Sequence, residues 1–151
     1  MIYWTRTKDV ILVLERINKM PKLKYGDKTA KALDNYIKDY KIPTGRTRTG
    51  IVASYRSMKN NFDTMNKMQL RESDPFFHCK ANYEATFRGG VVGGSVADVI
   101  SDLKEVKDVF VTGYPIKDSL RDQRANLRGK FGALNGKSLR ETCPTHHTKY
   151  K

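Results

Sequence analysis

The stretch DPFFHCKANYEATFRGGVVGGSVAD, residues 74–98, contains two helix starts with one helix end between them. Asp74 followed by Pro75 is typical of a helix N-terminus, because aspartate caps free backbone N–H groups and proline fits the first helical position. Gly89-Gly90 is typical of a helix end, where a left-handed conformation is common. The sequence therefore predicts a helix over residues 75–88.

The glycine-rich segment GGVVGG that follows predicts a linker. It precedes a helix, as phosphate-binding loops do, but it lacks the Gly-Lys-Ser/Thr ending of such loops. Ser95 with Asp98 has the spacing of a capping box and predicts the start of the next helix. Apolar residues then recur at helical spacing, and we expect them to point inward: Val99, Leu103, Val106 and Phe110.

A last helix is expected after the turn Gly113-Tyr114-Pro115. Ser119 with Asp122 predicts its cap, and the helix reaches about Leu134. From Asn135 the chain is polar, which predicts an irregular tail. The expected inward residues of this helix are Leu120, Leu127 and Phe131.

Residues 1–70 predict three further helices. The first covers about residues 7–20, the second begins at Asp27, and the third begins near Thr49 after the turn Pro43-Thr44-Gly45. Their expected buried residues are Val10, Leu14 and Ile17, then Ala30, Leu33, Ile37 and Tyr40, then Ile51, Tyr55, Met58, Phe62 and Met65.

These elements predict an all-α protein of two small helical subdomains. Residues 1–70 and 71–151 hold three helices each, with a hinge near residues 69–74 and an irregular C-terminal tail. Residues 109–112 form the only candidate strand. The longest apolar run, residues 10–14, is far shorter than the ~20 residues that cross a bilayer. The same N-terminal segment is too short and too charged for a Sec signal peptide, so we expect none.

Charge is the strongest compositional signal. Lys and Arg number 29 against 16 Asp and Glu, which gives a net charge of +13. A domain this basic is expected to meet a polyanion, such as nucleic acid, an anionic membrane surface or an anionic cell-envelope polymer. A surface that is basic only for solubility is the alternative.

Two cysteines, Cys79 and Cys143, lie far apart and form no CxxC motif. They are either one disulfide that ties the tail to the middle of the chain, or two separate buried thiols. No Cys/His spacing fits a zinc site, and the tail pair His146-His147 has no acidic neighbour. We therefore expect no metal site and no cofactor.

Residues 9–52 resemble the small three-helix peptidoglycan-binding module of bacterial cell-wall hydrolases and phage endolysins. The resemblance rests on the string Tyr25-Gly26, Thr29 and Ala32-Leu33, and on the later turn Ile42-Pro43-Thr44-Gly45. The chain departs from that family where Lys22-Leu23-Lys24 replaces the usual Asp-Gly. The resemblance implies cell-wall binding.

The binding residues expected from this module combine a turn with flat aromatic faces. Gly26 permits a left-handed turn that the Thr29 hydroxyl can close, and Tyr36 and Tyr40 could stack on a sugar. The alternative for both tyrosines is a place in the core. The basic stretch over residues 44–56 includes two further candidates, Arg46 and Arg48, which could contact an anionic polymer or nucleic-acid phosphates.

The C-terminal half offers candidate catalytic residues. Glycoside cleavage needs one acid with a raised pKa and a second carboxylate, and Glu84 lies among apolar neighbours in the predicted helix. His78 and Asn82 are i, i+4 neighbours, so Asn82 could orient the imidazole, and Asp122 is the candidate partner carboxylate. The alternative is an ion pair between Glu84 and Arg88, with Asp122 as a helix-start residue.

The predicted function is that of a phage or secreted bacterial protein that binds peptidoglycan and could cleave its glycan strands. Through residues 74–85 together with Asp118, Asp122, Asn126 and Arg128, the C-terminal half also resembles a small domain of polymorphic-toxin and phage proteins, with which no activity is associated. Expected partners are peptidoglycan or another anionic envelope polymer and other virion or injection-particle proteins, at the bacterial envelope, in the periplasm or in the virion. The alternatives are a structural particle component without chemistry, or a nucleic-acid-binding protein, which is less favoured.

Overall fold

The computed structural model describes residues 27–42, 50–70, 73–113, 115–143 and 145. These residues are all-α, as the sequence predicts, and hold no strand; residues 109–112 close a helix and enter the turn after it. The helices are α2 (Asp27–Lys38), α3 (Gly50–Met68), α4 (Asp74–Phe110), α5 (Ile116–Leu134) and α6 (Leu139–Thr142). The helix predicted over residues 7–20 lies outside the described residues.

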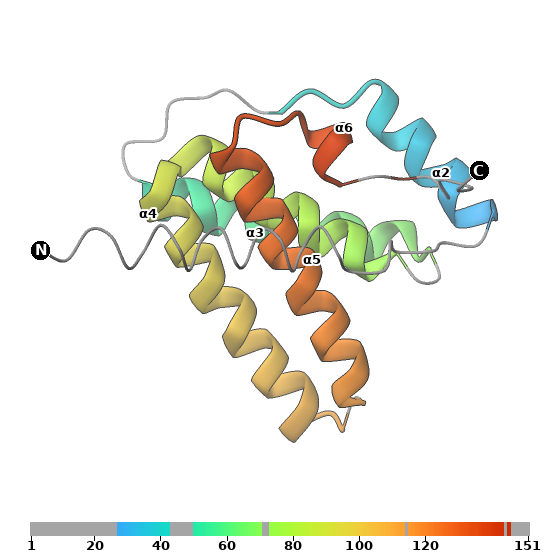
Figure 1. Cartoon of the computed structure of the whole chain (residues 1–151). Helices are drawn as coiled ribbons and strands as arrows, with labels where there is room; N and C mark the ends of the chain where they lie inside the picture. Colours follow the sequence, from blue (N-terminus) through green and yellow to red (C-terminus); the bar gives the residue numbers. More distant parts are fainter. Residues whose placement is uncertain (1–26, 43–49, 71–72, 114, 144, 146–151) are drawn as a thin grey trace, which may run out of the picture.

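Helix α4 changes direction sharply in its middle, as Figure 1 shows. Gly90 has φ 62° and ψ −151°, while the residues on both sides are helical. Because this region of backbone space is open almost only to glycine, Gly90 makes the bend possible. The prediction of a six-residue linker and a new cap at Ser95 is therefore wrong. Ser95 lies inside the helix, and its hydroxyl donates to the Val91 carbonyl.

The first half of α4 is the centre of the molecule. Every residue from 75 to 86 is buried, because α2, α3, α5 and α6 surround this segment. Its aromatic residues Phe76 and Phe77 join Leu33 and Ile37 of α2 in the main apolar core. The buried face predicted for α2 is confirmed at Ala30, Leu33 and Ile37.

Helix α3 packs against α4 across the subdomain boundary that the sequence predicts. The Ser54 hydroxyl donates to the Gly93 carbonyl, and Met58 joins Ala81 and Ala85 in a second apolar cluster. Two residues expected inside, Ile51 and Tyr55, are exposed instead. The division of the chain at residue 70 stays a prediction.

The second half of α4 points its large apolar residues toward solvent. Five of them are 54–82% exposed: Val92, Val99, Leu103, Val106 and Phe110. The residues that pack inward are small or polar: Gly93, Gly94, Ala97, Ser101 and Glu105. The prediction that the apolar face of this segment points inward is therefore wrong.

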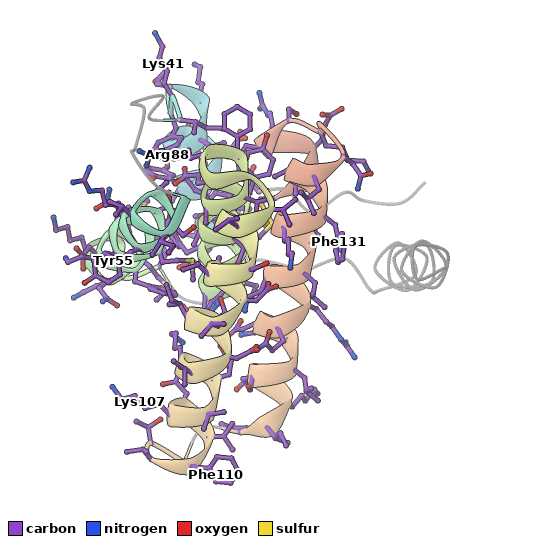
Figure 2. The ribbon with its side chains drawn as sticks, turned by 90° about the vertical axis from the view of Figure 1, so that its left-hand side faces the viewer. Lys41, Tyr55, Arg88, Lys107, Phe110 and Phe131 are labelled. Atoms are coloured by element: carbon purple, nitrogen blue, oxygen red, sulfur yellow. A yellow bond between two sulfur atoms is a disulfide. The ribbon has the colours of Figure 1, made fainter. Side chains whose placement is uncertain are left out.

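Helix α5 shows the same inversion and lies beside the second half of α4, so that the two helices extend together from the rest of the chain (Figures 1 and 2). Leu120 is exposed, and Leu127 and Phe131 are only partly buried. Its buried residues are Ser119, Asp122, Ala125, Asn126, Gly129 and Gly132. A side chain at Gly129 would collide with the Cys79 carbonyl, which shows how closely the helices approach.

The chain after α5 is more ordered than the predicted irregular tail. Ser138 caps α6 through a capping box with Glu141. Cys143 follows this turn and forms a disulfide with Cys79, with a Cα–Cα distance of 5.8 Å. The start predicted for α5 at Ser119 is also wrong, because the helix begins at Ile116 after Pro115.

Candidate functional site

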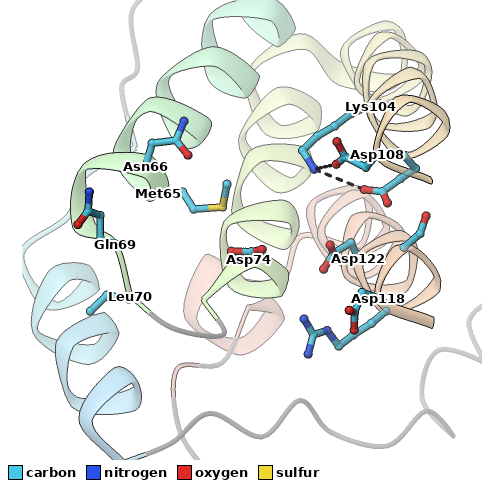
Figure 3. Close-up of a pocket in the computed structure, with 12 residues that line it drawn as sticks. Met65, Asn66, Gln69, Leu70, Asp74, Lys104, Asp108, Asp118 and Asp122 are labelled. Carbon is cyan, nitrogen blue, oxygen red and sulfur yellow. Dashed lines mark hydrogen bonds and ion pairs between the residues drawn. The ribbon is translucent and has the colours of Figure 1, made fainter. Parts of the chain in front are cut away.

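A pocket of about 670 Å³ opens between the end of α3, the start of α4, the second half of α4 and the start of α5 (Figure 3). Carboxylates dominate its polar lining, although the whole chain carries a net charge of +13. The acidic residues of the lining are Asp74, Glu105, Asp108, Asp118 and Asp122, and the basic ones are Lys104 and Arg121. The pocket is therefore an acidic hollow in a basic protein.

His78, in the first half of α4, lies behind the wall of this pocket, next to the lining residues Glu105 and Asp122. Its ring is fully buried, and Nε2 lies 3.7 Å from Asp122 Oδ2 and 3.9 Å from Glu105 Oε1. These distances are too long for hydrogen bonds. His78 Nε2, Glu105 Oε1 and Asp122 Oδ1 are buried polar atoms without a hydrogen-bond partner.

The other ring nitrogen of His78 is held by a network of amides. His78 Nδ1 lies 3.1 Å from Asn126 Oδ1. Asn82 Nδ2 donates to the same oxygen at 2.7 Å, to the backbone carbonyl of His78 at 3.0 Å and to Ser101 Oγ at 3.2 Å. The sequence suggests that Asn82 orients the imidazole directly. In the structure Asn82 instead donates to Asn126 Oδ1, and that oxygen faces His78 Nδ1.

Burial sets the protonation of this cluster. It lowers the pKa of His78 to about 3, and the charge of Lys104 adds to this effect, so the ring is neutral at pH 7. Burial also raises the pKa of Asp122 to about 7, and the nearby Glu105 carboxylate adds to it. Such opposed shifts are common at functional sites.

Glu84, the predicted acid, lies in a different cluster. Lys80 Nζ lies 2.8 Å from Glu84 Oε1 and donates to Asn61 Oδ1, while Asn61 Nδ2 donates to Glu84 Oε2. The ion-pair partner of Glu84 is therefore Lys80, one turn before it, where the sequence suggests Arg88. All three side chains are buried, so this network holds α3 against α4 and offers no free acid to a substrate.

Tyr36 and Tyr40 lie beside this ion pair and line a small hollow of about 310 Å³. Lys80 Nζ lies 3.7 Å from the centre of the Tyr40 ring, a cation–π contact. Burial and the Glu84 charge raise the pKa of Tyr36 to about 12. Both rings pack against the core, with the Tyr36 ring 5.9 Å from that of Phe77.

The other residues predicted to bind are divided between buried and undescribed positions. Thr29 is buried in the first turn of α2. Tyr25, Gly26, Arg46 and Arg48 lie outside the described residues.

The exposed apolar face is a second candidate site. On a helix, positions 92, 96, 99, 103, 106 and 110 recur every three, four or seven residues and form one continuous stripe. On α5 the residues Ile116, Leu120, Leu127, Phe131 and Leu134 form a similar stripe, beside which Lys117, Arg124 and Arg128 lie. Phe110 stands at the far tip of the two helices in Figure 2.

The structure brings His78, Asn82 and Asp122 together and adds Glu105 and Asn126, for which the sequence predicts no role. Their signal in the sequence is the row of small and polar residues at helical spacing, which marks the true inner faces of the two helices. Glu105 continues the row Gly94, Ala97 and Ser101 on α4, and Asn126 lies in the corresponding row of α5.

Comparison with known proteins gives one consistent result. The sequence profile of the serum amyloid A protein family matches residues 46–145, about two-thirds of the chain. The serum amyloid A-3 protein of Mus musculus is 40% identical over 77 residues, which cover 51% of this chain and 62% of that protein. The serum amyloid A-1 protein of Homo sapiens is 38% identical over 78 residues, with the same coverage of the two chains.

A third relative, the serum amyloid A protein of Notamacropus eugenii, is 38% identical over 69 residues, or 45% of this chain and 53% of that protein. The chain thus spans between half and two-thirds of the length of these curated relatives.

These findings contradict the predicted resemblances and the function drawn from them. The relatives are mammalian proteins named for serum. The predictions of a phage or bacterial protein, of peptidoglycan or virion partners and of a location at the bacterial envelope are therefore wrong. The toxin-like resemblance of the C-terminal half is wrong for the same reason. The peptidoglycan-binding resemblance was misleading because it rests on residues that form turns and begin helices in many helical proteins. These residues are Tyr25-Gly26, Thr29 and Ile42-Pro43-Thr44-Gly45.

Proposed function

We propose that this chain, which belongs to the serum amyloid A family, binds the phospholipid surface of lipoprotein particles in serum through the apolar stripe of α4. The stripe is defined by Val92, Val96, Val99, Leu103, Val106 and Phe110. One observation carries the proposal: a regular helix exposes five of these side chains, with Val96 partly buried, while small and polar residues take the inner face.

A lipid surface suits this stripe better than water does. Contiguous exposed apolar surface usually marks an interaction site. A helix with one apolar face lies in the plane of a lipid surface, with its apolar side chains at the boundary between headgroups and acyl chains. No helix among the described residues is long and apolar enough to cross a bilayer.

Basic residues near the stripe support the same partner. Lys107 is exposed next to Val106 on α4, and Lys117 and Arg124 are exposed on the neighbouring helix α5. Long basic side chains can lay their methylene groups on an apolar surface and extend the charged end to lipid phosphates. The net charge of +13 favours approach to any surface that also carries anionic lipid.

Binding to phosphatidylcholine vesicles tests the proposal. The double variant Leu103→Ser/Phe110→Ser removes the two largest side chains of the stripe without disturbing the core, because both are exposed. Burial of each is worth about 1.5–3 kcal/mol, so the dissociation constant should rise at least about 100-fold. Co-flotation of the full chain with vesicles measures this change.

A matched control removes as many exposed apolar side chains from another surface. Ile51→Ser/Tyr55→Ser alters two exposed residues of α3 that lie outside the stripe. This variant should float with vesicles as the unaltered chain does. Equal loss of binding in both double variants, or no loss in the first, would contradict the assignment to α4.

A further inference from the structure

The amide network fixes which nitrogen of His78 carries a hydrogen. Asn82 Nδ2 is a nitrogen, because it faces the backbone carbonyl of His78. The Asn126 atom that faces Asn82 Nδ2 must then be an oxygen. The ring nitrogen Nδ1, which faces that same oxygen, must be a donor.

The neutral ring therefore directs a lone pair from Nε2 into the pocket wall. The nearest atoms on that side are the carboxylate oxygens Glu105 Oε1, at 3.9 Å, and Asp122 Oδ2, at 3.7 Å. All three groups are buried acceptors when Asp122 is ionised, and the Nε2 and Glu105 Oε1 atoms have no hydrogen-bond partner. Three converging lone pairs repel one another unless a positive charge lies between them.

We propose that His78, Glu105 and Asp122 bind a divalent metal ion, and that Zn²⁺ is the ion that fits them. Imidazole nitrogen with carboxylate oxygen is an established ligand set for Zn²⁺. Asn126 fills the outer position that ligating histidines generally require, since its oxygen accepts the Nδ1 hydrogen and leaves Nε2 for the metal.

The spacing of the three atoms suits a tetrahedral ion. Zn²⁺ binds nitrogen and oxygen at about 2.0–2.2 Å, so tetrahedral ligands lie about 3.4 Å apart. The ligand atoms of the cluster all lie within 4.8 Å of one another. Small side-chain rotations bring them to this separation, and the pocket leaves room for water as the fourth ligand.

The electrostatics of the pocket favour a cation. Asp74, Asp108 and Asp118 line it in addition to the two carboxylate ligands. The opposing charges are Lys104 and Arg121. Lys104 Nζ lies 3.9 Å from Glu105 Oε1 but only 2.6 Å from Asp108 Oδ2, so its main partner is outside the proposed ligand set.

The chain offers a clean background for a test. It contains three histidines, and His146→Ala/His147→Ala leaves His78 as the one imidazole. The cysteines are joined in a disulfide, so no thiolate competes. We expect calorimetry on this chelator-stripped background variant, without lipid, to give one Zn²⁺ per chain. In protein labelled with ¹⁵N-histidine, the Nε2 resonance should shift on Zn²⁺ addition while Nδ1 keeps its hydrogen.

Isosteric variants in the same background assign the ligands. Asp122→Asn should weaken Zn²⁺ binding by more than the 10–100-fold that loss of an outer-shell partner costs. Asp118→Asn, a change in the same pocket outside the ligand set, should alter the affinity less than about threefold. Circular dichroism confirms that each variant is folded.

Three results would overturn the proposal. The first is no Zn²⁺ binding by the background variant, which would assign any binding by the unaltered chain to the tail. The second is equal affinity in Asp122→Asn and Asp118→Asn. The third is an Nε2 resonance of a protonated ring that Zn²⁺ does not change, which would identify a proton as the charge between the lone pairs. Because these measurements need no lipid, they are independent of the vesicle experiment.

Discussion

The two halves of α4 differ in how their apolar residues are placed. Residues 75–86 of the first half are buried on all sides, including the charged residues Lys80 and Glu84. The second half, after Gly90, is covered on one face only, by α3, α5 and the first half of α4, and its apolar stripe faces outward. The contrast teaches that hydrophobic spacing identifies a helix and its apolar face, but the packing of neighbours decides whether that face is inside.

The reason lies in how closely α4 and α5 approach. A side chain at Gly129 of α5 would collide with the Cys79 carbonyl of α4, and one at Gly93 would collide with the Ala85 carbonyl across the bend. The space that remains is filled by short polar side chains that hydrogen-bond across the contact, such as Asn82 with Asn126. The large apolar residues are thereby left on the outer face.

The test with the largest expected effect makes the same Phe-to-Ala substitution in each half of α4. Phe77→Ala should cost about 3–5 kcal/mol of unfolding free energy, because it opens a cavity in the main core. Phe110→Ala, at a side chain that is 82% exposed, should change it by less than about 0.5 kcal/mol. Urea titration measures both. A comparable loss in the two variants would mean that the second half of α4 is covered in solution.

The disulfide fastens the buried half. The double variant Cys79→Ala/Cys143→Ala should cost up to about 4 kcal/mol, since the bond closes a loop between cysteines 64 residues apart. Reduction of the unaltered chain during thermal unfolding should give a similar loss. Two freely alkylated thiols in native, air-exposed protein would show that the bond does not form.

Loss of the buried ion pair between Lys80 and Glu84 should lower the unfolding free energy by a smaller amount. Glu84→Gln leaves the Lys80 ammonium buried without a counter-charge and should cost about 3 kcal/mol. The double variant Lys80→Met/Glu84→Leu should recover most of this loss, because it removes both charges from the interior. Unfolding free energies of the single and double variants measure the recovery, and no recovery would mean that lost packing causes the cost.

The smallest effect concerns the boundary between the halves. Gly90→Ala should cost about 1–2 kcal/mol through backbone strain alone, because nothing lies within 4 Å of the added carbon. Gly89 is the adjacent comparison, since its added carbon would meet the Gly50 backbone. A neutral Gly90→Ala variant would show that the bend tolerates a side chain.

Local signals in the sequence located several of the helix ends. Asp27, Asp74-Pro75 and the end of α5 near Leu134 mark helix boundaries to within a residue or two, because capping and proline effects act over one turn. These signals failed at Gly89-Gly90. The pair is typical of a helix end, although the helix resumes after a single non-helical residue. They failed again at Ser95 and Ser119, whose cap-like spacing lies within helices.

The candidate site was predictable only in part. His78 and Asn82 are neighbours on one helix, so their spacing reveals them. Glu105 and Asn126 reach the cluster through the fold of α4 on α5, a contact between segments that no local pattern encodes. The direction of the apolar stripe escaped prediction for the same reason, since it depends on which face of the second half of α4 meets α3, α5 and the first half of α4.

The disulfide has a topological consequence for the second half of α4 and for α5. Both segments lie between Cys79 and Cys143, within one covalent ring. A single proteolytic cut in the exposed turn after Phe110 would open that ring without releasing a fragment, because the disulfide would still join the two pieces. The pair of helices could then splay at its tip while its base stays anchored to the buried core. On a gel, such a nicked chain would run as one band without reductant and as two bands with it.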